Sequence, residues 1–172
     1  MGGTEYARTP SFDQVYETLF PVIYRVSLRI TGDKEAAEDL CHEAFIRLME
    51  RPSMLPDMQQ SKYWLIRVVK NLSFNHEKRK RREKAAFTRL TMQSVTVDDS
   101  QDKQLVDDEV KSQVQGALDA LPYNLRVPLV FREYAGLSYK EIGSVLGISE
   151  SNVKVRIFRA REKLGKILGE GV

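Results

Sequence analysis

Hydrophobic residues recur every three or four positions along most of the chain, with polar residues between them. This spacing places the hydrophobic residues on one face of an α-helix. In the first half of the chain it predicts helices over residues 12–30, 34–49 and 61–84. Two prolines interrupt the pattern between the second and third helices, so we expect a loop at residues 51–60.

The helical spacing fades at residue 85 and returns near residue 110. Beyond this gap the spacing predicts four further helices, over residues 110–121, 124–135, 139–146 and from 150 onward. No stretch alternates hydrophobic and polar residues as a strand would, so we expect an all-α protein. We predict two small helical domains, at residues 11–85 and 109–170, joined by a flexible acidic linker at residues 86–108.

The composition limits the possible classes of protein. Hydrophobic residues make up 42% of the 172 residues, which is enough to bury a core. The hydrophobic runs are too short for a transmembrane helix, and residues 1–10 lack the hydrophobic stretch of a secretory signal. The single cysteine, Cys41, cannot form an internal disulfide or a multi-cysteine zinc site. We therefore expect a cytoplasmic protein with no membrane insertion, no bound metal and no other cofactor.

The net charge of +3 is small, but the charges are distributed unevenly along the chain. Six cations lie within residues 78–84, six acidic residues within 98–109 and six cations within 154–166. This order indicates two cationic modules joined by an anionic connector. The first cation cluster would repel itself unless a polyanion or a partner neutralised it, so we expect it to be functional.

Residues 138–164 carry the most specific pattern in the chain. Ser138 is a typical N-cap for a short helix, Gly147 is a typical helix stop, and Ser149 is a typical N-cap for the longer helix that follows. A short helix, a tight turn and a longer basic helix form the layout of a helix-turn-helix DNA-binding motif.

The last helix has two distinct faces at 100° per residue. Its hydrophobic residues share the face that is expected to pack inward: Val153, Ile157, Ala160, Leu164 and Ile167. Arg159 lies on the opposite face, where its guanidinium can reach base edges in the major groove. We expect DNA contacts from this face and its flanks, at Ser151, Asn152, Lys154, Val155, Arg156 and Arg159. The simpler alternative is a solvated basic helix of a bundle.

The helix around Trp64 is a second candidate, because aromatic and basic residues alternate around it and the first cation cluster follows. Stacking rings and flanking cations are typical of surfaces that hold single-stranded DNA. Trp64 itself is explained better as a core residue, since hydrophobic neighbours surround it at helical spacing. Asp39 and Glu43 are four residues apart and share a helix face, which fits either a solvated face or a partner-binding surface.

Four segments together resemble those of the bacterial RNA polymerase sigma factors of the small, two-domain extracytoplasmic-function group. They lie at residues 37–45, 64–71, 136–142 and 153–161. The resemblance extends from about residue 12 to residue 168, with the linker unmatched. It implies a non-catalytic subunit that binds core RNA polymerase and directs transcription from promoter DNA.

The resemblance also implies roles for individual segments. In such factors the acidic helix binds the clamp helices of the polymerase β′ subunit, and Asp39 and Glu43 occupy those positions here. The loop at 51–60 would form a pocket for a base flipped out of the −10 element. The second domain would dock on the β flap, and the linker would run toward the active-site channel. An anti-sigma factor commonly holds such proteins inactive, in some cases at the membrane.

The two DNA elements would then be read by different domains. Contacts to the melted −10 element are expected from Arg51, Trp64, Asn71, Lys78, Arg79, Arg81 and Arg82. Lys154 and Arg159 fall on positions that contact the −35 element in the family. Two residues depart from the family pattern: His42 replaces a common glutamine, and Val155 replaces a small polar residue. Both departures affect the promoter sequence that is read rather than the role.

Other functions remain open from the residues alone. A stand-alone helix-turn-helix regulator would bind duplex as a dimer, but the chain has no evident additional dimerisation helix. A sigma-like decoy would compete for an anti-sigma factor, and such a protein could lose DNA-reading cations that are present here. An enzyme is disfavoured, because the two histidines are far apart and no nucleophile or phosphate-binding motif occurs.

Overall fold

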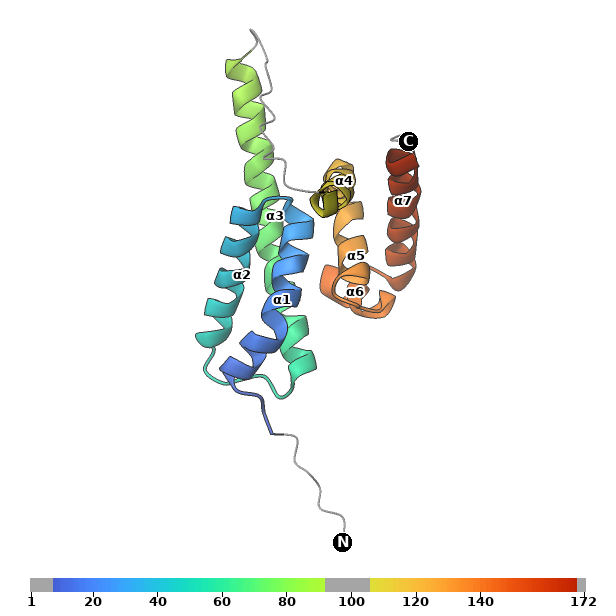
Figure 1. Ribbon diagram of the computed structural model, residues 1–172. Coiled ribbons are helices and arrows are strands. Elements are labelled where there is room, and N and C mark those ends of the chain that lie inside the picture. Colours follow the sequence, from blue (N-terminus) through green and yellow to red (C-terminus); the bar gives the residue numbers. More distant parts are fainter. Residues whose placement is uncertain (1–7, 92–105, 170–172) are drawn as a thin grey trace.

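The computed structural model describes residues 8–91 and 106–169, and within these ranges all regular structure is helical (Figure 1). The helices are α1 (Phe12–Thr31), α2 (Lys34–Met49), α3 (Met58–Leu90), α4 (Val106–Ala120), α5 (Tyr123–Glu133), α6 (Tyr139–Leu146) and α7 (Glu150–Gly169). Helices α1–α3 form one group and α4–α7 a second, which confirms the predicted all-α, two-domain fold. None of the described helices is both long enough and hydrophobic enough to cross a membrane.

Local capping determines the ends of the first two helices. Ser11 Oγ accepts from the Gln14 N–H at 3.2 Å, and the Gln14 side chain accepts from the Ser11 N–H at 2.9 Å, which completes a capping box. Gly32 ends α1 with φ at 70°, a conformation that costs glycine little. Asp33 then caps α2 by accepting from the Glu35 N–H at 2.9 Å.

The first group packs the hydrophobic faces of its three helices together. Its fully buried side chains include Val15, Ile23 and Val26 of α1, Cys41, Ala44 and Leu48 of α2, and Leu65, Ile66 and Val69 of α3. The helical spacing predicts most of these positions, but it does not single out Val26 or Ile66, which are also fully buried. Met49, which the same spacing places on the inner face of α2, is instead 59% exposed, because α2 ends at this residue beyond the core.

Helix α3 is longer than its hydrophobic spacing predicts at both ends. It begins at Met58 after the N-cap Asp57, and it continues past the expected end near Lys84 to Leu90. Residues 86–90, which the sequence pattern assigns to the linker, are therefore helical, and so are residues 106–108 at the start of α4. All residues from 78 to 90 are exposed, and Figure 1 shows this part of α3 extending beyond α1 and α2. The rest of the predicted linker, residues 92–105, lies outside the described residues.

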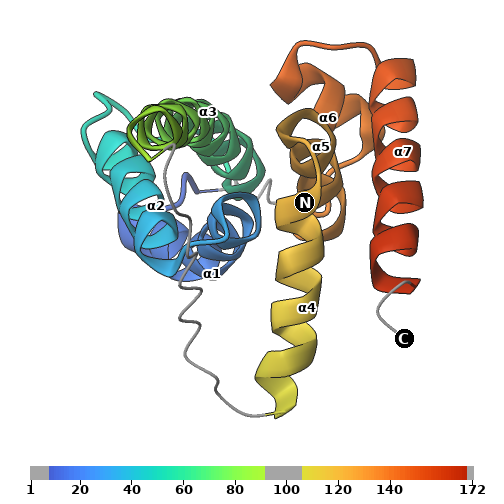
Figure 2. The same cartoon turned by 90° about the horizontal axis from the view of Figure 1, so that it is seen from above.

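The second group is built around α5, which packs against both α6 and α7. Pro122 occupies the N-cap position of α5, and Pro128 lies inside the helix with its ring buried. Because the helix begins at Tyr123, Pro128 removes a hydrogen bond only to the carbonyl of Asn124, an exposed residue whose backbone water can reach. In Figure 2, α7 lies on the side of this group that faces away from α1–α3.

One buried cation joins the two groups. Arg126 of α5 is only 6% exposed, and it donates to carbonyl oxygens at the ends of two other helices. Its Nε donates to Leu118 at 2.9 Å and its Nη2 to Leu121 at 2.9 Å, both at the end of α4. Its Nη1 donates to the carbonyl of Ile30 at 2.8 Å, at the end of α1. Arg126 therefore adds side-chain donors at the ends of α1 and α4, where there are fewer backbone N–H donors than carbonyl oxygens.

The turn between α6 and α7 depends on a close backbone approach. The Ile148 N–H donates to the Gly143 carbonyl at 3.0 Å, and Gly147 ends α6 with φ at 69°. A Cβ at position 143 would lie 2.7 Å from the Ile148 carbonyl oxygen, whereas a Cβ at Gly165 of α7 would meet no atom within 4 Å. Only glycine at 143 therefore allows the turn to close this tightly.

We predict that Gly143→Ala destabilises the protein by about 1–3 kcal/mol, because the added methyl group forces the turn backbone apart. The matched change Gly165→Ala, in open space on the same domain, should be neutral or should stabilise by up to about 1 kcal/mol. Urea unfolding of both variants measures the difference. Equal stability of the two variants would show that the turn does not require this approach.

Candidate nucleic-acid interface

The outward face of α7 carries the residues that the sequence predicts for duplex DNA. Ser151, Asn152, Lys154, Val155 and Arg159 are exposed, and Arg156 is half-buried. On the opposite face Val153, Ile157 and Ala160 are buried, so the predicted division of the helix into two faces is confirmed. Leu164 is only half-buried and Ile167 is 37% exposed, because the end of α7 extends past the core.

Contacts within the second group orient several of these side chains. The Arg156 Nε donates to Asn152 Oδ1 at 3.1 Å, which aligns both side chains along one edge of the outward face. Lys154 Nζ lies 3.6 Å from Glu150 Oε1 and 5.8 Å from the centre of the Tyr139 ring. Lys154 therefore lies beside α6 rather than at the centre of the outward face.

The turn before α7 is held by the capping residues that the sequence indicates. Ser149 Oγ accepts from the Asn152 N–H at 3.1 Å, and Ser138 Oγ accepts from the Glu141 N–H at 3.1 Å. The first turn of α7 consequently projects Ser151 and Asn152 into solvent. The structure thus brings the predicted duplex-binding residues to one open surface of a rigid helix pair.

Phe158 also belongs to this surface, although it is not among the predicted contacts. Its side chain is 70% exposed, and that of Val155 is 46% exposed. The helical spacing already places Phe158 near the outward face. A ring at that position is the feature of the sequence that could have identified it as part of this surface. Such apolar groups can contact thymine methyls in the major groove.

A continuous stripe runs along α3 and collects four of the predicted −10 residues. At 100° per residue, Trp64, Asn71, Lys78 and Arg82 fall within about 40° of one another around the helix. Asn71, Lys78 and Arg82 are exposed, and Trp64 is half-buried against the core. Arg51, from the preceding loop, lies with its guanidinium carbon 5.1 Å from the centre of the Trp64 ring. Trp64 therefore serves both the core, as its spacing predicts, and the outer surface.

Two of the predicted cations lie beside this stripe rather than on it. Arg79 and Arg81 fall about 80° from Asn71, on opposite sides of the helix. Arg81 pairs with Glu77 at 3.7 Å. Arg79 lines a recess of about 380 Å³ between α2 and α3, together with His76. The six cations that follow one another in the sequence are thus spread around α3, with Lys78 and Arg82 on the stripe, Arg79 and Arg81 on either side of it, and Lys80 and Lys84 opposite it.

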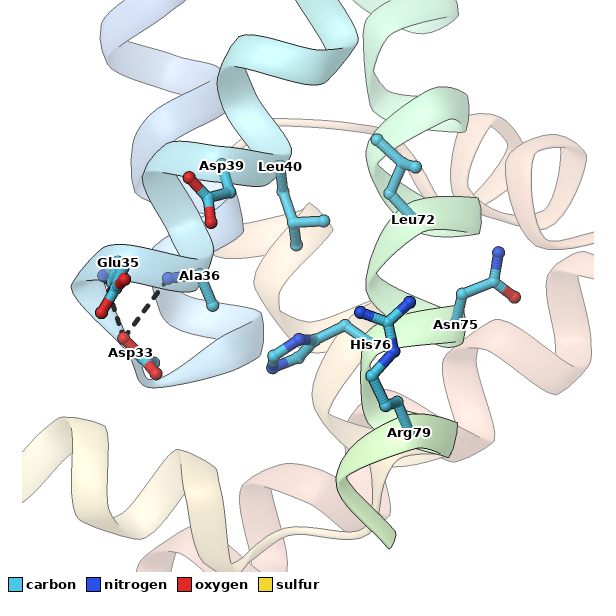
Figure 3. A pocket seen from close by; sticks show the side chains of 9 residues that line it. All are labelled: Asp33, Glu35, Ala36, Asp39, Leu40, Leu72, Asn75, His76 and Arg79. Atoms are coloured by element: carbon cyan, nitrogen blue, oxygen red, sulfur yellow. Dashed lines mark hydrogen bonds between the residues drawn. The ribbon is translucent and has the colours of Figure 1, made fainter. Parts of the chain in front are cut away.

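The predicted partner-binding residues, Asp39 and Glu43, have different surroundings. Asp39 is exposed and lines the recess between α2 and α3, and Figure 3 shows Asp33, Glu35 and Asp39 across this recess from His76 and Arg79. Glu43 lies one turn farther along α2 and accepts from Arg47 Nε at 2.9 Å. Both side chains reach the surface of α2, but only Asp39 borders the recess.

Cys41 and His42 are adjacent in the sequence but have different surroundings. Burial of Cys41, which has no exposed surface, raises the pKa of its thiol to about 12. His42 is exposed, and its ring lies 5.8 Å from the ring of Phe20. Among the described residues, no three histidine, cysteine or acidic side chains gather in a way that could hold a metal ion.

Comparisons with known proteins assign both groups of helices. The family model for Sigma-70 region 2 matches residues 15–83, and the model for Sigma-70, region 4 matches residues 111–164. The ECF RNA polymerase sigma factor SigE of Mycolicibacterium smegmatis is 31% identical over 169 residues, which cover 96% of this chain and 65% of SigE. The ECF RNA polymerase sigma factor SigW of Bacillus subtilis is 31% identical over 166 residues, which cover 92% of this chain and 89% of SigW.

The fold also resembles a solved structure. The sigma factor RpoE, in its complex with the anti-sigma factor NepR from Bartonella quintana, matches with a TM-score of 0.66 and 21% sequence identity. The match covers 92% of this chain and 96% of that chain. This chain spans less than two thirds of SigE but most of SigW and RpoE. The chain therefore belongs to the extracytoplasmic-function group of the sigma-70 family of RNA polymerase sigma factors.

Proposed function

We propose that this sigma factor binds core RNA polymerase and directs it to promoters by reading the −35 element as duplex and the −10 element as melted single strand. The observation that carries the proposal is the pair of exposed surfaces on separate domains, the outward face of α7 and the stripe on α3. One is a rigid helix that fits a major groove, and the other combines a ring with aligned cations. The protein itself performs no catalysis.

The first surface suits direct reading of bases. Arg159 stands on the exposed face of α7, and its guanidinium can donate two hydrogen bonds to one guanine. The paired Arg156 and Asn152 flank it along the same helix. Cations at the edges would contact phosphates and fix the register of the helix on the duplex.

The second surface suits capture of an unstacked strand. Trp64, with Arg51 against its ring, lies at one end of the stripe, and Lys78 and Arg82 lie toward the other. Extruding a base from the duplex costs a few kcal/mol, and stacking together with phosphate contacts would offset that cost. The loop at 51–60 would then receive the flipped base.

We propose the remaining roles because the chain belongs to this family of sigma factors. Residues 11–85 and 109–170 are the two functional domains, and residues 86–108 connect them. Asp39 and Glu43 on α2 would bind the β′ clamp helices, and the second domain would dock on the β flap. The protein would act in the cytoplasm, and an anti-sigma factor, which could be anchored in the membrane, would inhibit it.

Arg159→Ala tests the −35 assignment. We expect promoter binding by the holoenzyme to weaken by about 1–3 kcal/mol and discrimination to relax at a single −35 position, because one bidentate contact is lost. The measurement is affinity for a set of promoters that differ at each −35 position. Arg161→Ala is the control, since Arg161 lies on the other side of α7 and pairs with Glu133 at 2.8 Å. A uniform loss across the set would make Arg159 a phosphate contact instead.

The −10 assignment can be tested by removing two charges from the stripe on α3 and, as a control, two charges from the opposite face of the same helix. The double variant Lys78→Gln/Arg82→Gln should weaken capture of the melted strand. It should also make the slope of log affinity against log salt concentration shallower by about 0.7 for each phosphate contact that is lost. The control Lys80→Gln/Lys84→Gln removes the same charge, with the same spacing, from the opposite face of α3. Open promoter complexes formed at several salt concentrations give both slopes. Equal slopes for the two double variants would show that the stripe is not the strand-binding face.

A further inference from the structure

The C-terminal end of α3, residues 78–90, projects from the protein without packing against it. All of these residues are exposed, and Figure 1 shows this end of the helix beyond the ends of α1 and α2. Helices in proteins are stabilised mainly by burial of a hydrophobic face, and a helix of this length is only marginally stable without it. This end of α3 buries no such face, so its whole surface is available to a partner.

The projecting end carries far more positive charge than its neighbours neutralise. It holds seven cations and a single acidic residue, Glu83. Lys78 and Arg82 are four residues apart, and like charges at this spacing destabilise a helix. Of the seven cations, only Arg81 forms an ion pair with a described residue, Glu77. An excess of cations on an exposed helix indicates a polyanion as the partner.

One of these cations, Arg89, continues the stripe to the end of the helix. It is seven residues after Arg82, which places it within about 20° of Arg82 around the helix and about 10 Å farther along the axis. Both side chains are exposed, and Arg89 lies in the last turn of α3. Lys78, Arg82 and Arg89 thus form one row of cations that runs from the middle of α3 to its end.

The helix surface between Arg82 and Arg89 carries only small side chains. Ala85 and Ala86 face this side, at about 60° and 40° from Arg82. Phe87, the largest side chain of the segment, lies about 140° away on the other side of the helix. Two methyl groups leave room for a bulky, rigid partner to approach the helix, while the two guanidinium groups extend toward it.

The chemistry of the stripe changes along its length. At its start Trp64 offers a ring on which an unstacked base can lie, with Arg51 beside it. Beyond Arg82 the same face offers a cation and methyl groups but no ring, because Phe87, which is 64% exposed, lies on the other side. A cation without a stacking platform suits duplex DNA, in which the bases are already stacked and the phosphates form the accessible surface.

We propose that the projecting end of α3 is a duplex-binding site, in which Arg89 contacts phosphates of the double-stranded DNA that borders the melted −10 element on its −35 side. The proposal rests on the strand-binding role of the stripe given above. If the −35 element is read as duplex and the −10 element as single strand, the DNA between them has to change from one form to the other. The stripe would hold the strand and Arg89 the duplex, which fixes the position of the junction.

A purely structural role for Arg89 is the alternative. A cation in the last turn of a helix interacts favourably with the negative end of the helix dipole. The last turns of α3 have other local support, because the Thr88 hydroxyl donates to the Lys84 carbonyl at 2.8 Å and the Thr91 hydroxyl donates to the Phe87 carbonyl at 2.6 Å. A structural role predicts lower helix content in an Arg89 variant, and it predicts no effect that depends on the form of the DNA.

Two DNA probes distinguish duplex phosphates from strand phosphates. Both come from one promoter of the −35 test above, and both carry the −35 duplex and the unpaired −10 strand. In the fork probe the complementary strand continues up to the −10 element. In the gapped probe it is missing over roughly 10 nucleotides, about one helical turn, before that element. Fluorescence anisotropy with the holoenzyme measures the affinity for each probe.

Arg89→Gln should weaken binding to the fork probe at least about threefold at about 0.1 M salt, because one duplex phosphate contact is lost. The slope of log affinity against log salt concentration should become shallower by about 0.9. Binding to the gapped probe should not change. Arg89→Lys should keep most of the affinity for the fork probe, since a phosphate contact needs the charge rather than the planar shape of the guanidinium.

Lys84→Gln is the matched control, because it removes one charge from the opposite side of the same part of α3. It should bind both probes as the wild type does, and circular dichroism should give equal helix content for all variants. Equal losses of Arg89→Gln on the two probes would overturn the proposal, because Arg89 would then contact the single strand. The absence of any loss, or an equal loss in Lys84→Gln, would overturn it as well.

The double variant Lys78→Gln/Arg82→Gln tests the strand-binding role of the stripe separately, on the gapped probe. A loss there, with no loss for Arg89→Gln on the fork probe, would show that only the duplex site is wrong. No loss there, with a loss for Arg89→Gln confined to the fork probe, would refute the strand-binding stripe and keep the duplex contact. The two failures are therefore distinguishable in one set of measurements.

Discussion

The buried guanidinium of Arg126 is the contact on which the arrangement of this molecule depends. It donates four hydrogen bonds to backbone carbonyls, at Leu118, Asp119, Leu121 and Ile30. These carbonyls lie where two helices end, which is where backbone oxygens lack partners and where the helix dipole is negative. A buried arginine is costly to desolvate, so it persists only where nearly all of its donors are satisfied, as they are here.

Both surfaces that we propose for DNA reading are positioned relative to this contact. Arg126 fixes the end of α4 against the start of α5, and α5 is the helix on which α6 and α7 pack. The outward direction of α7 therefore follows from the packing of α5. The same side chain reaches the end of α1, so it also links the second domain to the helix bundle that carries the stripe on α3. One residue thus links the helix packing within the second domain to the position of that domain on the first domain.

The sequence predicts the parts of this fold that depend on neighbouring residues. Ser11, Asp33, Gly147 and Ser149 act as the capping residues that their types indicate, and the two faces of α7 follow from its spacing. The extension of α3 to Leu90 is not predictable from hydrophobic spacing, because those residues are helical without being buried. The role of Arg126 is hidden as well, since its partners are up to 96 residues away in the chain. The side of α3 that contacts the second domain, through Arg67 and Phe74, cannot be told from a solvated face by its sequence, because its partners Ser144 and Tyr123 are distant in the chain.

Transcription start-site mapping with purified core RNA polymerase, with and without this protein, is the decisive test of promoter recognition. We expect discrete new start sites on a library of promoter fragments, each preceded by one shared pair of −35 and −10 sequences. The absence of new start sites, despite binding of the protein to core polymerase, would contradict it.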